Sequence, residues 1–350
     1  RDSSTSRGLG DVYKRQIRDN GMSGLRLFNT LAKEKQNFIP HVSHHVGIYA
    51  CGPTVYNRIH VGNARPLVLF DILVKLLRYR YDTVTYVRNI TDVDDKITQR
   101  AMEKGITIDS LCQQTIADFH HDCNALNVVA PDVEPRATQH ISEMLEMIKE
   151  LIESGHAYEA SGHVLFSVST MPEYGKLSGR SMDQMIAGAR VEVAPYKKDP
   201  GDFVLWKPSD INQPGWESPF GRGRPGWHIE CSAMARKYLG KEFDIHAGGL
   251  DLIFPHHENE IAQSCCAHNT KNMAQYWVHN GYVTVNGEKM SKSAGNFTAV
   301  ADALTKHRGE AIRYALMAAH YRAPLDYSCL LYTSDAADDS LRVDLGGRRI

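Results

Sequence analysis

The sequence predicts an α/β fold, in which a parallel sheet forms two halves that are separated by an insertion and followed by the start of a helical region. Residues 46–51 and 83–90 have the β-branched and aromatic content of buried strands. Between them, the apolar residues of 64–80 recur at helical spacing. A strand, a helix and a second strand make a βαβ unit, and this unit indicates a parallel sheet.

The rest of the chain repeats this pattern around a segment of different composition. Residues 96–156 are mostly helical in pattern, and their last amphipathic helix ends at Gly155. Residues 157–225 contain short strands among many prolines, glycines and serines, which indicates an insertion. Two strand patterns, at 243–249 and 278–287, and a helical pattern at 309–319 complete the second half.

The composition is that of an ordinary globular protein of two or three domains. Of its 350 residues, 42% are hydrophobic and 23% are charged. The net charge of −1 excludes a global basic field, although a local basic groove stays open. No run of 18 apolar residues occurs, so we expect no membrane span. The seven scattered cysteines fit a reducing, cytoplasmic location with thiols free for metal or packing.

Both ends of the chain lack helical or strand periodicity and resemble translated sequencing-adapter DNA. The alternative is a pair of disordered termini. On the first interpretation Met22 is the natural start, and the natural chain continues beyond Ser328. The expected organisation is a non-native or disordered 1–21, a first catalytic half at 22–156, an insertion at 157–225, a second half at 226–300, a helical start at 301–328 and a non-native tail at 329–350.

Residues 60–63, "HVGN", lie between the first predicted strand and the first predicted helix. A helix N-terminus offers free backbone N–H groups and a positive dipole end, which together suit a phosphate. His60 can donate a hydrogen bond to a phosphoryl oxygen, and Gly62 lets a ligand approach the backbone closely. The alternative is a structural histidine in a turn.

Residues 288–296, "EKMSKSAGN", follow a predicted strand and combine Lys289 and Lys292 with small residues. A loop of this kind can close on a polyphosphate and neutralise charge as it develops. The alternative is a solvated basic turn.

Residues 254–260, "FPHHENE", crowd histidines and glutamates directly after a proline, which is favoured in the first turn of a helix. If a helix begins here, His256 and Glu260 stand at i and i+4 on one face. That spacing is how a helix offers two metal ligands.

These three motifs together resemble a known family. "HVGN" and "EKMSKS" resemble the HIGH and KMSKS signatures of class I aminoacyl-tRNA synthetases. Further segments narrow the resemblance to the cysteinyl-tRNA synthetases: "YACGPTVYNRIHVGNAR", "VRNITDVDDKI", "PRATQHI", "DFVLWK", "GRPGWHIECSAM" and "FPHHENEIAQS". The resemblance runs from about Leu25 to Ser328. It implies a Rossmann-like nucleotide-binding sheet.

The resemblance implies one zinc ion, held by Cys51, Cys231, His256 and Glu260. Two thiolates, an imidazole and a carboxylate suit Zn²⁺ chemically. The metal would also take the thiolate of the substrate cysteine. Serine has nearly the same size, and rejecting it ~10⁴-fold needs about 5.5 kcal/mol of differential binding. A zinc–sulfur bond depends on the one atom that differs between the two amino acids, which is sulfur in cysteine and oxygen in serine.

The resemblance also implies the activity: ATP, with Mg²⁺, activates cysteine to cysteinyl-adenylate, and the cysteinyl group is then transferred to tRNA(Cys). A monomer is expected. His60, Lys289 and Lys292 are assigned to the phosphates. Asn63 replaces the second histidine of HIGH and keeps only hydrogen-bonding ability. Other implied contacts are Trp227 and His246 in the cysteine pocket, Asp251 with Gly248 and Gly249 at the ATP ribose, and Thr54 and Thr91 at the substrate amino acid. For Trp227 the alternative is core packing.

Two other functions stay open at this point. A ligase that joins cysteine to an amino sugar in mycothiol synthesis would keep the zinc, ATP and cysteine sites and dispense with tRNA. A non-catalytic, zinc-dependent nucleic-acid-binding module would leave the KMSKS-like loop unexplained.

Overall fold

The computed structural model describes residues 24–327 apart from 182–183, 185–193 and 293. The two segments that we predict to be non-native, 1–21 and 329–350, lie outside the described residues. Within the described part, no helix is long and apolar enough to cross a membrane.

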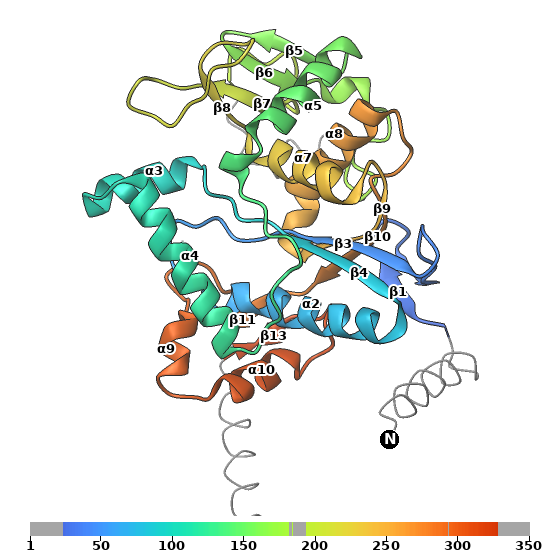
Figure 1. The fold of residues 1–350 in the computed structure, drawn as a ribbon, viewed down its shortest axis with the longest axis vertical. Coiled ribbons are helices and arrows are strands. Elements are labelled where there is room, and N and C mark those ends of the chain that lie inside the picture. Colours follow the sequence, from blue (N-terminus) through green and yellow to red (C-terminus); the bar gives the residue numbers. More distant parts are fainter. Residues whose placement is uncertain (1–23, 182–183, 185–193, 293, 328–350) are drawn as a thin grey trace, which may run out of the picture.

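A four-stranded parallel sheet lies at the centre of the molecule (Figure 1). Its order is β10-β9-β3-β4, and each neighbouring pair runs parallel. Its strands are β3 (His45–Ala50), β4 (Thr83–Arg88), β9 (Phe243–Gly249) and β10 (Ala274–Asn280). The two inner strands, β3 and β9, come from opposite halves of the sequence. The predicted α/β fold with a parallel sheet is confirmed.

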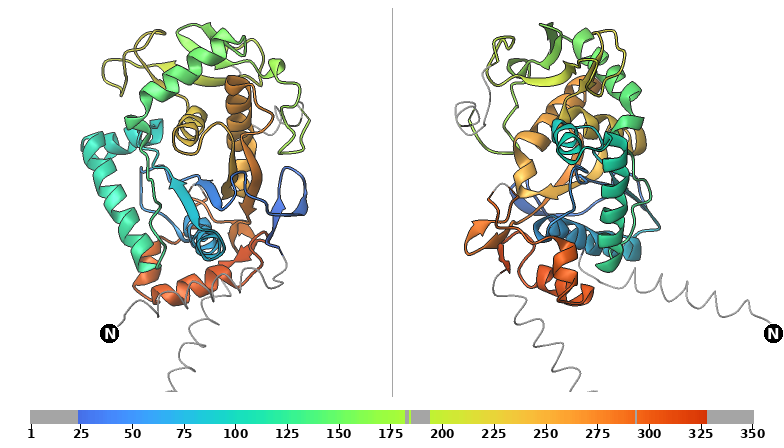
Figure 2. Two further views of the ribbon diagram at one scale, coloured as in Figure 1. Left: turned by 45° about the vertical axis from the view of Figure 1, so that its right-hand side comes forward. Right: turned by 90° about the vertical axis from the view of Figure 1, so that its left-hand side faces the viewer.

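Helices cover both faces of this sheet (Figure 2). On one face α2 (Val61–Arg80) makes the crossover from β3 to β4. On the other face α7 (Trp227–Leu239) contacts β3 and β4 and packs on α8 (Glu258–His268). The sheet is therefore buried on both sides, as parallel sheets require.

Further elements surround this core. A hairpin of β1 (Arg26–Asn29) and β2 (Glu34–Asn37) packs beside β10. After β4 come α3 (Asp95–Lys104), α4 (Ile108–Ala125), the 3-10 turn Ala137–Gln139 and α5 (Ile141–Glu153). An antiparallel sheet of β5 (Ala157–Ala160), β6 (His163–Phe166), β7 (Phe203–Pro208) and β8 (Gly223–Pro225) then stands at one end of the molecule, between α5 and α7 in sequence (Figures 1 and 2).

The last described elements lie at the opposite end from this antiparallel sheet (Figure 2). They are β11 (Val283–Val285), β12 (Glu288–Lys289), α9 (Val300–Leu304), α10 (Gly309–Met317) and β13 (Leu325–Asp326). Helices α9 and α10 pack on α2, and β11 pairs with both β12 and β13. The 288–296 loop is thus held close to the start of α2.

One local prediction was wrong in detail, because the strand pattern at 278–287 is divided between β10 and β11. Between them the backbone passes close to the 320–323 segment at Gly281, where an added Cβ would lie 2.3 Å from the carbonyl oxygen of Ala323. The helix predicted to begin at Pro255 is confirmed. In the π-helical turn Ile253–His257 only Phe254 has non-helical φ and ψ angles, so helical backbone runs from Pro255, after its cis bond to Phe254, into α8.

Candidate functional site

The predicted site residues gather at the carboxyl edge of the parallel sheet. Cys51 directly follows β3, and Thr91 follows β4 after two residues. Gly248 and Gly249 end β9, and Asp251 follows them after one residue. Ligands of open α/β sheets bind outside this edge, so the topology itself explains why distant segments meet here.

Four side chains predicted to bind metal come together at this edge. One donor atom from each of Cys51, Cys231, His256 and Glu260 lies within 4.8 Å of all the others. Cys231 lies on α7 and Glu260 on α8, and these two helices pack against each other. Cys51 and Cys231 stand far apart in the sequence from each other and from the His256–Glu260 pair, and they meet this pair only because β3, α7 and α8 converge.

The spacing of these donors fits Zn²⁺. The Sγ atoms of Cys51 and Cys231 are 4.0 Å apart, and Cys51 Sγ lies 3.7 Å from Glu260 Oε1. Tetrahedral zinc with bonds of about 2.0–2.3 Å separates its ligands by about 3.4–3.8 Å. His256 Nε2 and Glu260 Oε1 are closer, at 2.9 Å, which is an ion-paired hydrogen-bond distance. Binding an ion therefore requires these two atoms to separate by only a few tenths of an ångström.

The protonation of the cluster also suits a cation. Hydrogen bonding from the Cys51 thiol is the main cause that lowers the pKa of Cys231 to about 6, against burial, which raises it. Burial and the neighbouring Cys231 raise the pKa of Cys51 well above its usual value. Burial acts to raise the pKa of Glu260, but His246 and His256 outweigh it and hold that pKa at about 2. A thiolate and a carboxylate are thus already present as ligands.

His246 and Trp227, both predicted to line the cysteine pocket, contact this cluster in different ways. His246 is fully buried, and its Nε2 lies 2.8 Å from Glu260 Oε2. It therefore fixes the orientation of the carboxylate. Trp227 is 40% exposed, and its ring stacks on His256 with centroids 4.3 Å apart. The alternative of core packing does not describe a side chain this exposed.

The sequence analysis missed three further histidines of this site. His257 Nε2 lies 3.3 Å from Cys51 Sγ, and its Nδ1 lies 2.8 Å from His279 Nε2. His228 Nδ1 lies 3.0 Å from His256 Nδ1. His257 stands three residues before Glu260, a spacing that also places two side chains on one helical face and could have signalled it. Nothing in the local sequence pointed to His228 or His279.

Thr54 and Thr91, both predicted to contact the substrate amino acid, lie side by side in a parallel bridge. The Thr91 hydroxyl donates to Glu230 Oε2 at 2.9 Å. Glu230 is itself buried, and burial together with the charge of Cys231 raises its pKa well above its usual value. Thr91 is thus tied to the carboxyl group beside the metal cluster, and the sequence analysis did not single out Glu230.

His60 is the N-cap of α2 and forms a reciprocal cap with Asn63. The Asn63 backbone N–H donates to His60 Nδ1 at 3.3 Å, and the His60 backbone N–H donates to Asn63 Oδ1 at 3.2 Å. Burial, and then the charge of Lys292, lower the pKa of His60 to about 4. The imidazole is therefore neutral. Because Nδ1 accepts a hydrogen bond, its proton is on Nε2, which is free to donate.

The 288–296 loop is tied to this helix start. The Val61 backbone N–H donates to the Thr298 carbonyl at 2.9 Å, and that of Val300 donates to the Ile59 carbonyl at 3.1 Å. Met290 is buried, and a β-carbon on Gly62 would lie 3.7 Å from its Cβ. That β-carbon would also lie 2.9 Å from the His60 ring, so glycine here keeps the cap close to the loop.

The two predicted loop lysines point to different neighbours. Lys289 Nζ donates to Asp251 Oδ2 at 2.9 Å. Lys292 Nζ lies over the Tyr56 ring, 4.4 Å from its centroid. Gly248 packs against the metal cluster, because an added Cβ would lie 2.7 Å from His257 Cε1, and Gly249 directly follows it. The residues predicted at the ATP ribose thus lie between the loop and the cluster.

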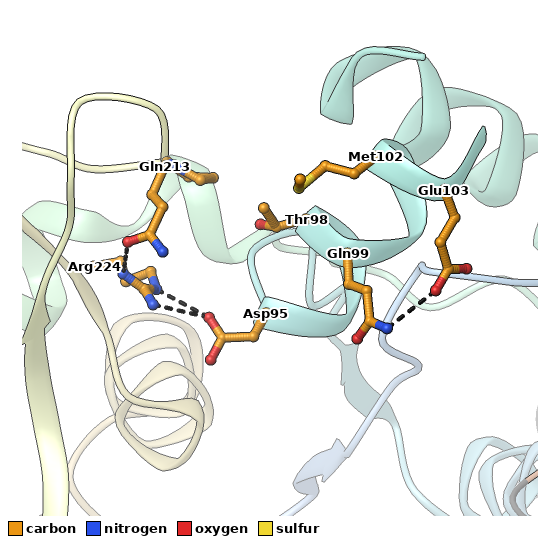
Figure 3. Close-up of a pocket in the computed structure, with 8 residues that line it drawn as sticks. Asp95, Thr98, Gln99, Met102, Glu103, Gln213 and Arg224 are labelled. Carbon is orange, nitrogen blue, oxygen red and sulfur yellow. Dashed lines mark hydrogen bonds and ion pairs between the residues drawn. The ribbon is translucent and has the colours of Figure 1, made fainter. Parts of the chain in front are cut away.

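A cavity of about 500 Å³ lies between α3 and the turn before β8 (Figure 3). It is lined by Asp95, Thr98, Gln99, Met102, Glu103, Gln213, Pro214 and Arg224. Arg224 Nη2 donates to Asp95 Oδ1 at 3.0 Å and so joins α3 to the antiparallel sheet. None of the predicted site residues lines this cavity.

A parallel α/β sheet with a histidine-capped helix and a lysine loop at its carboxyl edge defines the class I aminoacyl-tRNA synthetases. The tRNA synthetases class I (C) catalytic domain family matches residues 37–334. The chain belongs to this family, that of the cysteine–tRNA ligases. The match extends six residues beyond Ser328, into the segment that we predict to be non-native.

Curated relatives agree with this assignment, and a solved structure agrees with the fold. The cysteine–tRNA ligases of Rhodospirillum rubrum and Rhodospirillum centenum are 62% and 59% identical over 304 residues, 87% of this chain. The chain spans 66% of the first relative and 67% of the second, about two thirds of their length. A Mycobacterium tuberculosis methionyl-tRNA synthetase in complex with methionyl-adenylate has a TM-score of 0.63 at 17% identity, covering 81% of this chain and 66% of its own. That likeness shows the fold alone.

Proposed function

We propose that this chain activates cysteine with ATP and Mg²⁺ to cysteinyl-adenylate, for transfer to tRNA(Cys). The observation that carries the proposal is the convergence of Cys51, Cys231, His256 and Glu260 at the carboxyl edge of the sheet, beside the capped helix and the lysine loop. The cysteine–tRNA ligases that the chain resembles support it. The domain division predicted from the sequence belongs to the same proposal.

Those four residues would hold zinc, which supplies a soft Lewis acid that binds the thiolate of cysteine and discriminates against serine. Trp227 stands over His256 and would shield this end of the pocket from water. Thr91, oriented by Glu230, offers a hydroxyl near the bound amino acid. Thr54 lies beside it. These side chains would present the substrate carboxylate toward the start of α2.

At that helix start, neutral His60 donates from Nε2 to a phosphoryl oxygen, and the backbone of the first turn adds its free N–H groups. Lys289 and Lys292 neutralise charge on the departing pyrophosphate. Asn63 contributes the cap that orients His60 rather than a contact of its own. The protein positions the reactants and stabilises charge, and little covalent chemistry falls to its side chains.

Cysteine-dependent exchange between ATP and labelled pyrophosphate tests the proposal, together with zinc content and a serine control. Exchange with cysteine and not with serine, on protein containing one zinc per chain, is the expected result. Aminoacylation of tRNA(Cys), measured beside glucosaminyl-inositol as acceptor, separates the tRNA ligase from the amino-sugar ligase. A non-catalytic module predicts no exchange with either amino acid.

Since the chain spans about two thirds of its relatives, we expect weaker charging than adenylate formation. We also propose a cytoplasmic monomer, for which sedimentation velocity is the test of mass.

A further inference from the structure

Two cations on α3 lie beside the KMSKS loop and have no part in the function described so far. Lys96 and Arg100 are four residues apart, so they share one face of the helix. Lys96 Nζ lies 5.9 Å from the centroid of the Tyr56 ring, and Lys292 Nζ lies 4.4 Å from the same centroid. Tyr56 packs on the hydrophobic core under α2 and α4. Its ring is thus a fixed platform at which helix and loop cations meet.

This cationic cluster, Lys96, Arg100 and Lys292, brings three positive charges together with one ion pair among them. Within the described part of the chain, no carboxylate lies within ion-pair distance of Lys96 or Lys292. Arg100 has one partner, Glu103, at 3.0 Å, and its buried Nε has none. Burial, then the charges of Arg100 and Lys96, lower the pKa of Lys292 to about 8. Crowded cations of this kind are stabilised by an anion that contacts them together.

The opposite side of α3 has the reverse character. Asp95 faces the cavity of Figure 3 and pairs with Arg224 and Lys207 of the antiparallel sheet. Glu103 lines the same cavity. Helix α3 therefore directs Asp95 toward the antiparallel sheet and Lys96 toward the loop, while Arg100 pairs with Glu103. An anion is expected on the loop side only.

We infer that Lys96 and Arg100 complete, with Lys292, the subsite for the β- and γ-phosphates of ATP, which leave as pyrophosphate. The inference rests on the proposed function. The charges of Lys292 and Lys289 both act on His60, so the cluster continues the phosphate site that begins at the N-terminus of α2. A triphosphate laid from His60 toward α3 would place its far end at Lys96 and Arg100.

The chemistry gives these residues their role. A carboxylate oxygen of cysteine forms a bond to the α-phosphorus. The bond from that phosphorus to the oxygen bridging to the β-phosphate breaks, and its electron pair leaves with pyrophosphate. Negative charge therefore grows on the leaving group, and cations placed around it stabilise the transition state more than the ground state. The phosphodiesters of a tRNA acceptor end carry similar charge, and the experiment separates the two.

The test compares Lys96→Ala, Arg100→Ala and the double variant with Lys104→Ala, an exposed lysine at the end of the same helix. Each is assayed for cysteine-dependent exchange at varied pyrophosphate, ATP and cysteine. We expect the KM for pyrophosphate to rise about tenfold per residue, as the loss of one charge-assisted hydrogen bond predicts. The KM for cysteine, zinc content and the Lys104→Ala variant should not change.

An unchanged KM for pyrophosphate in the double variant overturns the inference. So does a rise confined to the KM for tRNA, which would assign the cluster to nucleic-acid phosphates. If the unsubstituted chain shows no exchange, the proposed function fails, and calorimetric titration with inorganic pyrophosphate then decides the subsite separately. Weaker binding by the double variant supports the subsite, and equal binding removes it.

Discussion

The side chains of His60 and Asn63 each accept a hydrogen bond from the other residue's backbone N–H, and this reciprocal cap starts α2, the longest helix of the described chain. The contact assigns Asn63 a role that the family motif alone did not. A second histidine at this position is not required for the cap, since an amide oxygen accepts the hydrogen bond equally well. The same contact fixes which nitrogen of His60 carries the proton, and so which one can meet a phosphate.

Replacing Asn63 should therefore affect stability and catalysis together. Asn63→Ala removes the acceptor for the His60 N–H and should cost about 1 kcal/mol in the free energy of unfolding. Exchange should slow as His60 loses its fixed orientation. Asn63→Asp keeps the acceptor and should preserve stability, while its charge raises the KM for ATP. Urea unfolding and exchange assays measure both quantities, and an Asn63→Ala protein as stable and active as the original would contradict the role.

The sequence predicted the sheet because β3, α2 and β4 each carry their own periodicity. The i, i+4 spacing pointed to His256 and Glu260, but Cys51 and Cys231 were named only through the family motifs, since tertiary packing alone brings them to this pair. His228 and His279 escaped for the same reason, because nothing local marks a histidine that is functional only through its neighbours.

The start of α8 shows where a local signal was enough. Proline at 255 suits a first helical turn, and the backbone is helical from Pro255 onward, because only Phe254 in the preceding turn departs from helical φ and ψ angles. His256 and Glu260 therefore stand at i and i+4, and His256 Nε2 lies 2.9 Å from Glu260 Oε1. The spacing predicted this pair for the right structural reason, whereas its approach to Cys51 and Cys231 depends on tertiary packing.

The lowered pKa of His60 makes stability depend on pH. Its pKa is about 4 in the folded chain and 6.5 without the fold, because burial and Lys292 disfavour the charged ring. Above pH 6.5 neither state binds the proton, and stability is complete. As pH falls from about 6.5 toward 4, the unfolded chain binds the proton first and stability is lost.

His60→Asn keeps a good N-cap and removes this titration. The unfolding free energy of the original chain should fall by about 1–2 kcal/mol more than that of the variant between pH 7 and 4.5, less than the whole shift implies because solvent screens part of it. Other buried histidines contribute equally to both proteins, so the difference isolates His60. Parallel curves of stability against pH would rule out the assigned cause.

Cys231→Ala tests the choice of cysteine over serine. Loss of one of two thiolate ligands should remove zinc at micromolar free metal and reduce cysteine-dependent exchange by at least ~10²-fold, since four protein ligands hold the ion in the proposal. Cys266→Ala is the matched control, because this partly buried thiol on α8 packs against the core and lies outside the cluster. Metal analysis and exchange with both amino acids give the answer. A Cys231→Ala protein that keeps zinc and selectivity would remove Cys231 from the site.

His246→Gln tests whether His246 orients the Glu260 carboxylate or contacts the bound amino acid itself. The imidazole touches Glu260 Oε2, and partners of this kind typically change metal affinity by ~10–100-fold when they are replaced. We expect zinc to bind more weakly by that factor, with selectivity for cysteine intact once metal is saturating. Competition with a chelator measures the affinity. Loss of selectivity at saturating zinc would show instead that His246 contacts the amino acid.

Arg65, five residues after His60, connects the capped helix to the base of the KMSKS loop. Its guanidinium is fully buried and donates to the carbonyl oxygens of Gly281, Tyr282 and Ala323 at 2.8–2.9 Å and to that of His320 at 3.3 Å. Burial lowers its pKa to about 10, so the side chain stays charged at neutral pH. Arg65→Met removes all four of these hydrogen bonds, and for the Ala323 carbonyl no other donor is described. The variant should lower the unfolding free energy by more than about 3 kcal/mol. Arg65→Lys keeps the charge but not the planar fork, and we expect it to recover part of that loss.

In exchange assays on the lysine variant the KM for ATP should rise more than the KM for cysteine, because the displaced segment leads into β11 and the loop rather than into the metal cluster. Equal effects on both constants would show that Arg65 supports the fold as a whole and does not position the loop.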